Sequence, residues 1–361
     1  MSTQIILQGH ALEILKDIPD EFFDTVITSP PYWSLRDYSV EPLIWDGKDG
    51  CEHSFNEYNA KLLHENRQGL EGSTIGNNEY RKQLHGFGNA KAGFCSLCGA
   101  WRGSLGLEPT FQLYLDHLMQ IMGECKRVMK PTGCMFINLG DSYGGSQSGG
   151  IEDNKAAKHG TGATSLGNHR PSKDVLPKSL VGIPERFAIR MTDELGMIRR
   201  NTIIWYKRSC MPSSAHDRFT VDFEYVYFFT RQGDYWFEQQ FEPHLTPIGK
   251  PRNRNKESTN QGYPQGDRFS PGERTGYGEQ GRNRRCVWDI PAKPFKGAHF
   301  AVFPPGLVEP MLKAGCPPDG WVLDPFAGSG TVGMVAKQQD KNVIGIEFNP
   351  IYCQMAEERI K

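Results

Sequence analysis

The last quarter of the chain alternates short apolar runs with amphipathic stretches, and this alternation constrains the fold more than any other feature. Residues 307–314, 332–339 and 351–360 have the apolar spacing of helices. Between them, residues 322–323 and 343–346 form apolar runs that are typical of buried strands. Strands that alternate with helices build a mostly parallel sheet with helices on both faces. The sequence therefore predicts a doubly wound α/β fold.

The same alternation occurs earlier in the chain, where polar stretches interrupt it. The pattern predicts helices at 12–18, 110–129 and 183–195, and strands at 4–8, 25–28, 134–139, 201–206 and 225–230. Between residues 39 and 107 the apolar periodicity fails, and Gly, Asn, His and charged residues dominate. We interpret 39–107 as an insertion rather than as core, and 142–180 and 242–285 as polar loops.

A Gly-rich peptide directly follows one predicted strand and directly precedes a helix. It consists of Asp324, Pro325, Phe326, Ala327, Gly328, Ser329, Gly330 and Thr331. Small residues at such a turn let the backbone approach a ligand, and the free amides of a helix N-terminus bind a carboxylate. Glu347 ends the next strand, where a carboxylate can accept hydrogen bonds from two ribose hydroxyls. Together they predict an adenosine-type ligand, whereas the Gly-rich turn alone could serve packing only.

A second, rigid peptide follows the strand predicted at 25–28. It consists of Ser29, Pro30, Pro31, Tyr32 and Trp33. Two consecutive prolines fix the backbone without donating hydrogen bonds. The Ser29 hydroxyl and the Pro30 carbonyl can both accept from an amino group, while Tyr32 or Trp33 stacks on the ring that carries it. An amine conjugated to a ring is a poor nucleophile until two acceptors hold its hydrogens out of the ring plane. A rigid turn with core aromatics is the alternative.

These peptides resemble those of the DNA amino-methyltransferases that modify cytosine N4 or adenine N6, in the permuted order in which the catalytic peptide precedes the cofactor peptide. Residues 29–32 match the catalytic tetrapeptide, and 324–331 match the cofactor loop. The other matching segments are 299–304 with Phe303, 201–207 with Trp205 and Lys207, and the strand end 138–143, which looks like that of phage-type members. The resemblance covers most of the chain.

The resemblance implies a Rossmann-like methyltransferase sheet of seven strands, one of them antiparallel. It implies S-adenosylmethionine as methyl donor and a target base that is flipped out of the duplex. Residues 1–38 and 108–361 would form the catalytic domain. The residues implied in cofactor binding are 324–331, Glu347, Phe348 and Phe303, and those implied in the target-base pocket are Trp33, Trp205 and Lys207.

The first residue of the tetrapeptide bears on the target base. Ser29 is typical of cytosine N4 enzymes, whereas Asp or Asn is commoner in adenine N6 enzymes, so we favour cytosine N4 with adenine N6 as the alternative. His10 stands where many relatives have Asp, which puts a cofactor contact there in doubt. An RNA or protein N-methyltransferase and a catalytically silent DNA-binding homologue are further alternatives. A cytosine C5 enzyme is excluded, because the chain lacks the Pro-Cys dipeptide that carries its nucleophile.

A cluster of metal-ligand residues lies within the insertion. The candidate ligands are Cys51, His53, Cys95 and Cys98. The second Cys pair has CxxC spacing followed by Gly99, as in zinc knuckles, which predicts a structural Zn²⁺ that orders the insertion. Two unrelated thiol pairs are the alternative, and His64 or His85 could replace His53.

The distribution of charge limits the kinds of partner that the protein can bind. Lys and Arg number 41 against 42 Asp and Glu, so a basic surface must be local. Residues 243–285 hold nine Lys or Arg and four acids, with Tyr263, Phe269 and Tyr277 between them, which favours contact with double-stranded DNA over a merely solvated loop. Residues 142–180 are the second candidate loop; their basic residues include Lys155, Lys158, His159, Arg170 and Lys173.

The chain shows neither a secretory signal nor an apolar run of roughly 20 residues, so we expect a cytoplasmic protein whose nine cysteines are mostly reduced. A cognate restriction endonuclease is a possible partner, and the protein is expected to be a monomer or a dimer.

Overall fold

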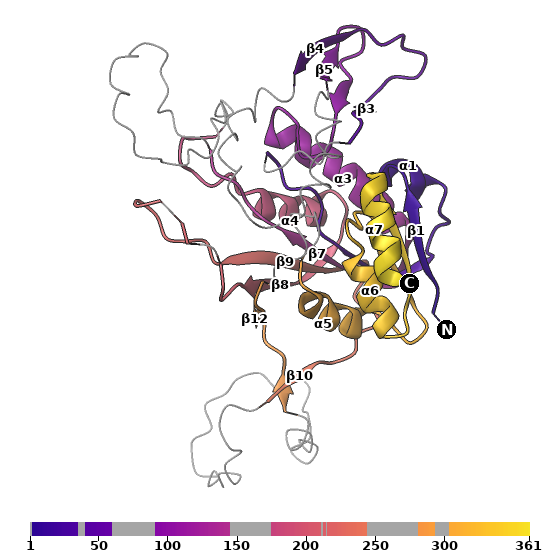
Figure 1. Ribbon diagram of the computed structural model, residues 1–361, viewed down its shortest axis with the longest axis vertical. Helices are drawn as coiled ribbons and strands as arrows, with labels where there is room; N and C mark the ends of the chain where they lie inside the picture. Colours follow the sequence, from indigo (N-terminus) through magenta and orange to yellow (C-terminus); the bar gives the residue numbers. More distant parts are fainter. Residues whose placement is uncertain are drawn as a thin grey trace, which may run out of the picture.

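The computed structural model describes residues 2–34, 40–59, 91–144, 175–210, 212–213, 215–243, 281–292 and 303–361. Within these residues, an eight-stranded open sheet forms the centre of the molecule (Figure 1). Its strands, in spatial order, are β1 (Gln4–Gln8), β14 (Asn342–Glu347), β13 (Trp321–Asp324), β2 (Phe23–Thr28), β7 (Met129–Leu139), β9 (Phe223–Thr230), β8 (Ile198–Tyr206) and β12 (Val287–Asp289).

Strand β9 runs antiparallel to both of its neighbours, and the other pairs are parallel. The mostly parallel sheet and its one antiparallel strand are confirmed. The predicted count of seven strands is wrong: the sheet has eight, because β12 adds a strand at the edge beside β8. With only three residues, β12 is too short to produce a periodic signal.

Helices cover both faces of the sheet, as the doubly wound prediction requires. One face carries α1 (Ala11–Lys16), α3 (Phe111–Val128) and α4 (Ile183–Asp193); the other carries α5 (Pro305–Gly315) and α6 (Thr331–Gln338), with α7 (Pro350–Ile360) beside α6 (Figure 1). Thr110 caps α3 by accepting a hydrogen bond from the Leu113 amide at 3.2 Å. No described helix combines the length and the apolarity needed to cross a membrane.

Strand β7 separates two hydrophobic cores. Met135 and Ile137 point into the core under α1, α3 and α4, whereas Cys134 and Phe136 point into the core under α5 and α6. A strand buried on both faces is apolar throughout rather than alternating, and this is why the run at 134–139 was recognisable. The strand begins earlier than predicted, at Met129, because a register shift against β2 absorbs the segment from Pro131 to Gly133.

The described parts of 39–107 contain a second, antiparallel sheet. Its order is β3 (Leu43–Trp45), β6 (Trp101–Gly103), β5 (Lys91–Cys95) and β4 (Phe55–Asn59). We expected this stretch to lie outside the core. Trp45 and Trp101, which face each other across β3 and β6, are instead 3% and 1% exposed and belong to the core under α3.

Two glycines in helices allow a matched test of this packing. A Cβ on Gly315 would lie 2.5 Å from Cys134 Sγ and 2.7 Å from Phe136, whereas a Cβ on Gly123 of α3 would meet nothing nearer than 3.8 Å. We expect Gly315→Ala to lower the free energy of unfolding by about 1–3 kcal/mol through overpacking. Gly123→Ala should raise it by roughly 0.5–1 kcal/mol, since Ala favours a helix. Urea denaturation measures both, and equal effects would contradict the close approach of α5 to the sheet.

Candidate active site

The carboxyl ends of four neighbouring parallel strands, β1, β14, β13 and β2, lie at one edge of the sheet. The Gly-rich peptide follows β13 and the Pro-Pro peptide follows β2. Thr28 Oγ1 donates to Asp324 Oδ1 at 2.7 Å, so the two peptides are linked although their residues are 296 positions apart. In open α/β sheets this edge is where ligands bind.

The Gly-rich loop is built on left-handed backbone. Gly328 and Gly330 have φ of 52° and 75°, and a Cβ on Gly330 would lie 2.8 Å from the Cβ of Ala356. Glycine is therefore needed at Gly330 for both its conformation and its packing. Ser329 and Thr331 are 2% and 3% exposed, and both accept hydrogen bonds from the Arg359 guanidinium of α7. These hydrogen bonds stabilise the loop from its buried side.

Glu347 lies across from this loop at the end of β14. Its carboxylate accepts from the Gly328 amide at 2.8 Å and from the Asn349 amide at 2.7 Å. Burial raises the pKa of Glu347 to about 7, against these two hydrogen bonds, which lower it. Such a carboxylate is oriented but incompletely solvated, so it can readily accept further hydrogen bonds from ligand hydroxyls.

The remaining residues expected near the cofactor are partly exposed aromatics and His10. Phe326 and Phe348 follow the ends of β13 and β14 at this edge, whereas Phe303 packs against the core under α5 and α6. The His10 ring lies 5.0 Å from the Trp45 ring and 6.1 Å from the Phe348 ring. Burial lowers the pKa of His10 to about 4, so His10 is neutral at pH 7 and places no positive charge there.

The Pro-Pro peptide presents a polar face toward β7 and β9. Ser29 Oγ lies 3.5 Å from Asn138 Oδ1, and the Tyr32 hydroxyl lies 3.1 Å from the same oxygen. The Tyr32 hydroxyl also lies 2.8 Å from Glu224 Oε2, which can accept its hydrogen. Three side chains from distant parts of the sequence therefore converge beside Ser29.

The orientation of the Asn138 amide is fixed by its surroundings. Its Nδ2 donates to Glu224 Oε2 at 3.1 Å and to the Tyr225 carbonyl at 3.0 Å, so both amide hydrogens are used. Oδ1 must then face Ser29 and Tyr32, where it is an acceptor. Lys207 Nζ forms an ion pair with the other Glu224 oxygen, which holds the carboxylate in place.

Sequence reasoning missed Glu224. The only available signal was a single acid near the start of β9, whose other residues are almost all apolar or aromatic. A partly buried charge needs a partner, and Lys207, which directly follows the adjacent strand β8, is that partner.

The three aromatic residues proposed near the target ring differ in exposure. Trp33 is 9% exposed, and its indole N–H donates to the Glu108 carbonyl at 2.9 Å. Trp205 is 4% exposed and donates to the Ile290 carbonyl at 2.8 Å. Tyr32 is partly exposed. Of the three residues, Tyr32 is the most exposed.

The structure brings the four candidate metal ligands together. The ligand atoms of Cys51, His53, Cys95 and Cys98 all lie within 4.8 Å of one another. Cys51 Sγ lies 4.0 Å from Cys95 Sγ, and Cys98 Sγ lies 3.4 Å from His53 Nδ1. Sulfurs around a tetrahedral zinc are about 3.8 Å apart, from Zn–S bonds of about 2.3 Å. The donor set and its spacing fit zinc. His64 and His85 lie outside the described residues.

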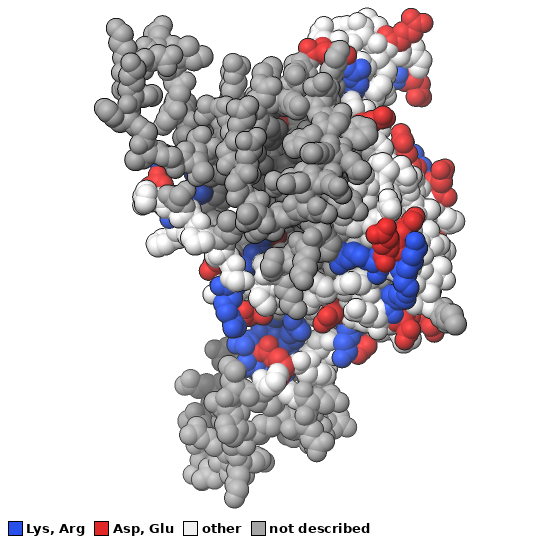
Figure 2. Space-filling model, viewed as in Figure 1, with Lys and Arg blue, Asp and Glu red and all other residues white. Residues whose placement is uncertain are grey.

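Most of the two candidate DNA loops also lies outside the described residues, including all the basic and aromatic residues named between 155 and 173 and between 263 and 277. At the base of the second loop, β10 (Phe241–Glu242) pairs with β11 (Arg282–Asn283). Glu242 forms ion pairs with Arg282 and Arg285 at 2.8 and 2.6 Å. On the face drawn in Figure 2, the Lys and Arg side chains of the described residues lie among Asp and Glu side chains.

The doubly wound sheet places the Gly-rich loop and the Pro-Pro peptide at adjacent strand ends, an arrangement typical of α/β enzymes that bind a nucleotide-like ligand. The sequence profile of the DNA methylase family that covers N6 and N4 enzymes matches residues 23–358. The chain therefore belongs to this family of DNA methyltransferases.

Its relatives span nearly its whole length. The type II methyltransferase M.XycI of Xanthomonas campestris pv. cyanopsidis is 30% identical over 358 residues, which cover 99% of this chain and 87% of the relative. M.Cfr9I of Citrobacter freundii is 29% identical over 356 residues, with the same coverage.

Solved structures share the fold. The cytosine-N4-specific PvuII DNA methyltransferase has a TM-score of 0.55 at 17% identity, covering 100% of this chain and 87% of that one. TTHA0409 of Thermus thermophilus, a putative DNA modification methylase complexed with S-adenosyl-L-methionine, has a TM-score of 0.51 at 19% identity, covering 99% and 93%. These likenesses confirm the α/β fold.

The buried Asp324 makes the stability of the site depend on pH. Burial raises the pKa of Asp324 to about 7, so the folded protein holds a proton that the unfolded chain loses near pH 4. Stability from this group is complete at low pH and is lost as the pH rises through 7. Asp324→Asn keeps an oxygen for the two donors, Thr28 Oγ1 at 2.7 Å and the Phe326 amide at 3.1 Å, and removes the charge.

We expect the stability of Asp324→Asn relative to the wild type to increase by about 2–3 kcal/mol between pH 5 and pH 8. Urea denaturation at both pH values measures this change. Asp319→Asn, at a turn before β13, is the control and should show no such trend. A pH-independent difference at position 324 would contradict the assignment.

Proposed function

We propose that the protein transfers a methyl group from S-adenosylmethionine to the exocyclic N4 of cytosine in DNA, with adenine N6 as the alternative target. The observation that carries the proposal is the hydrogen bond between Thr28 and Asp324, because it holds the amine-binding peptide beside the Gly-rich loop. A transfer between two substrates requires both sites at one edge. Ser29 and the cytosine-N4 specificity of the structurally similar PvuII methyltransferase favour cytosine N4.

The Gly-rich loop fits S-adenosylmethionine by its chemistry. The amides of Phe326, Gly328 and Gly330 already donate within the protein, so the amides at the N-terminus of α6 would receive the amino-acid carboxylate. Glu347 would accept from the ribose hydroxyls, and the partly exposed Phe326 and Phe348 rings would flank the adenine. When bound, the cofactor supplies an electrophilic methyl group on sulfonium.

The residues beside Ser29 would hold the target amine. Ser29 Oγ, Asn138 Oδ1 and the Pro30 carbonyl are the candidate acceptors for its two hydrogens, and Tyr32 would stack on the flipped base. The Pro31 carbonyl already accepts from the Tyr114 hydroxyl at 2.8 Å, so it is directed away. With both hydrogens held out of the ring plane, the nitrogen lone pair would be free to displace the thioether from the methyl carbon, so that an N–C bond replaces the S–C bond. The methylated nitrogen would then release one hydrogen as a proton to solvent. Positioning supplies most of the rate enhancement.

Identification of the methylated base tests this proposal. The protein is incubated with unmethylated plasmid DNA and S-adenosylmethionine, and the DNA is digested to nucleosides for mass spectrometry. We expect N4-methylcytosine. Ser29→Ala and Tyr32→Phe should slow its formation by about 10- to 100-fold, because each removes a polar group that positions the amine.

Tyr235→Phe is the matched control, since its hydroxyl contacts Arg200 at 3.0 Å and belongs to neither peptide. N6-methyladenine would keep the mechanism but contradict the reading of Ser29. Absence of any methylated base would favour the RNA, protein or silent DNA-binding alternatives. Double-stranded DNA is the proposed partner, and the type II names of the relatives are consistent with a paired restriction endonuclease.

We also propose that Cys51, His53, Cys95 and Cys98 bind a structural Zn²⁺. Four protein ligands leave no open coordination position, so the metal would order the small sheet rather than take part in methyl transfer. The Gly99 amide donates to the Cys95 carbonyl at 2.9 Å, and Gly99 has φ of 81°, which forms the tight turn of the CxxC segment.

Metal analysis of the purified protein tests the zinc site. We expect about one zinc per chain, released by denaturation with chelator. Cys98→Ser should lose most of the metal and lower the melting temperature, because the sheet that bears Trp45 and Trp101 would lose its cross-link. Cys286→Ser, at an exposed cysteine outside the cluster, is the control. Metal-free wild-type protein with an unchanged melting temperature would contradict the site.

A further inference from the structure

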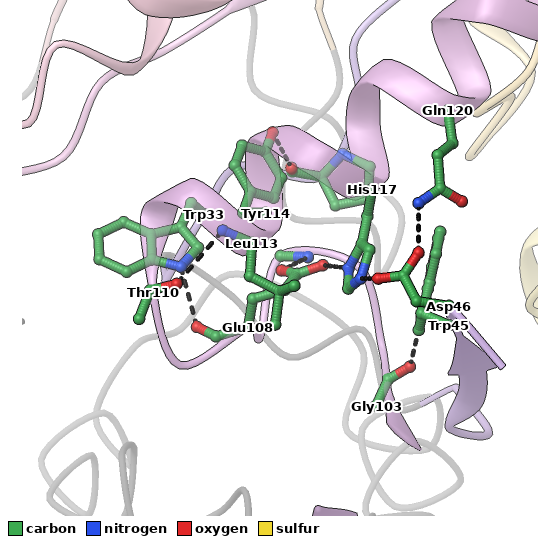
Figure 3. Close-up of polar contacts among 12 residues, drawn as sticks. Trp33, Trp45, Asp46, Gly103, Glu108, Thr110, Leu113, Tyr114, His117 and Gln120 are labelled. Carbon is green, nitrogen blue, oxygen red and sulfur yellow. Dashed lines mark hydrogen bonds and ion pairs between the residues drawn. The ribbon is translucent and has the colours of Figure 1, made fainter. Parts of the chain in front are cut away.

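A buried carboxylate and imidazole lie between the small sheet and the Pro-Pro peptide (Figure 3). Glu108 Oε1 lies 2.9 Å from His117 Nδ1, and both side chains are 0% exposed. The second carboxylate oxygen, Oε2, accepts from the Gly106 amide at 2.8 Å. The surroundings of Glu108 exclude water, and this burial raises the pKa of its carboxyl. The methyl-transfer site described above does not use this pair.

One side of the pair contacts the small sheet. His117 Nε2 lies 3.3 Å from Asp46 Oδ2, directly after β3, and Asp46 Oδ1 accepts from Gln120 at 2.7 Å. The rings of Trp45 and Trp101 stack on the His117 ring, with centroids at 4.4 and 5.3 Å. Both ring nitrogens of His117 therefore face carboxylate oxygens.

The other side of the pair contacts the Pro-Pro peptide. The Glu108 carbonyl accepts from the Trp33 indole at 2.9 Å, and the Ser34 amide donates to the Gly106 carbonyl at 2.8 Å. One helical turn before His117, Tyr114 donates to the Pro31 carbonyl at 2.8 Å. The loop that carries Glu108 and the helix that carries His117 therefore each hold one part of the peptide.

We propose that Glu108 and His117 are positioning residues that fix the peptide 29–33 for methyl transfer, acting through Trp33 and Pro31. This role rests on the proposed function. The bond between Glu108 Oε1 and His117 Nδ1 locks the loop against α3, so the two anchors of the peptide keep one relative position. Small displacements of reacting groups are costly to the rate, which gives this lock a catalytic consequence.

The chemistry of the pair favours a role in orienting the neighbouring groups over a role in stabilising the core. A buried ionisable pair loses hydration when the chain folds, and apolar side chains of similar volume would often stabilise the core as well or better. What apolar side chains lack is direction, because dispersion does not specify which atoms meet. The pair uses both carboxylate oxygens and both ring nitrogens in directed contacts.

Three variants of His117 separate a role in positioning the peptide from a role in stabilising the core. His117→Asn places an amide nitrogen where Nδ1 lies, so it keeps the contact with Glu108. His117→Gln places an amide nitrogen where Nε2 lies, so it keeps only the contact with Asp46. His117→Phe keeps an aromatic ring against the two indoles but loses the contacts with Glu108 and Asp46. Single-turnover methylation of unmethylated plasmid DNA and calorimetric binding of S-adenosylmethionine are measured on each. Gln120→Ala, on the same helix but in contact with Asp46 only, is the control.

We expect His117→Gln and His117→Phe to lower the single-turnover rate about 10- to 100-fold, with one cofactor site per chain and an affinity within about 2-fold of the wild type. His117→Asn should restore the rate to within about 3-fold, and Gln120→Ala should match the wild type. Rates that fall in proportion to the number of cofactor sites, or equal rates for the Asn and Gln variants, would overturn the inference. Wild-type protein that transfers no methyl group would overturn the proposed function and this role together.

Discussion

The hydrogen bond from Thr28 to Asp324 is the contact on which the arrangement of the site depends. It joins the ends of β2 and β13, which pair in parallel through Thr25 and Val26 against Val322 and Leu323. Parallel pairing places both carboxyl ends at the same edge, so peptides near the two ends of the chain meet there. The cost is a buried carboxyl whose pKa rises to about 7. The site thus contains a group that weakens the fold at neutral pH.

The sequence predicted the middle of the central sheet well because β2, β13 and the second half of β7 are buried on both faces. Short apolar runs within these strands stand out from polar surroundings, and helices such as α3 combine apolar spacing with a capping Thr110. The short strands of the small sheet lack such runs and were not predicted. Trp45 and Trp101 enter the core from that polar stretch, which no periodic pattern can indicate.

The site was predictable where its chemistry is local. The motifs at 29–33 and 324–331 consist of consecutive residues, so they can be recognised in the sequence. Two of the candidate metal ligands can be recognised in the same way from their CxxC spacing. Glu224 could not be found in this way, since its contact with Tyr32 joins residues 192 positions apart. Nor could the sequence decide that Trp33 turns inward while Tyr32 stays partly exposed. That choice depends on the Glu108 carbonyl, which Trp33 meets only in the folded chain.

Three carboxyls whose pKa is raised by burial lie at or near the candidate active-site edge, and each has two hydrogen-bond partners. They are Asp324 with Thr28 and Phe326, Glu347 with Gly328 and Asn349, and Glu108 with His117 and Gly106. Each would be replaced by an apolar residue if stability alone were favoured, since desolvation opposes its charge. Methyl transfer from a sulfonium needs little covalent participation by the protein and much alignment of two substrates. Directed acceptors supply that alignment, whereas an apolar edge would bind both substrates without orienting either.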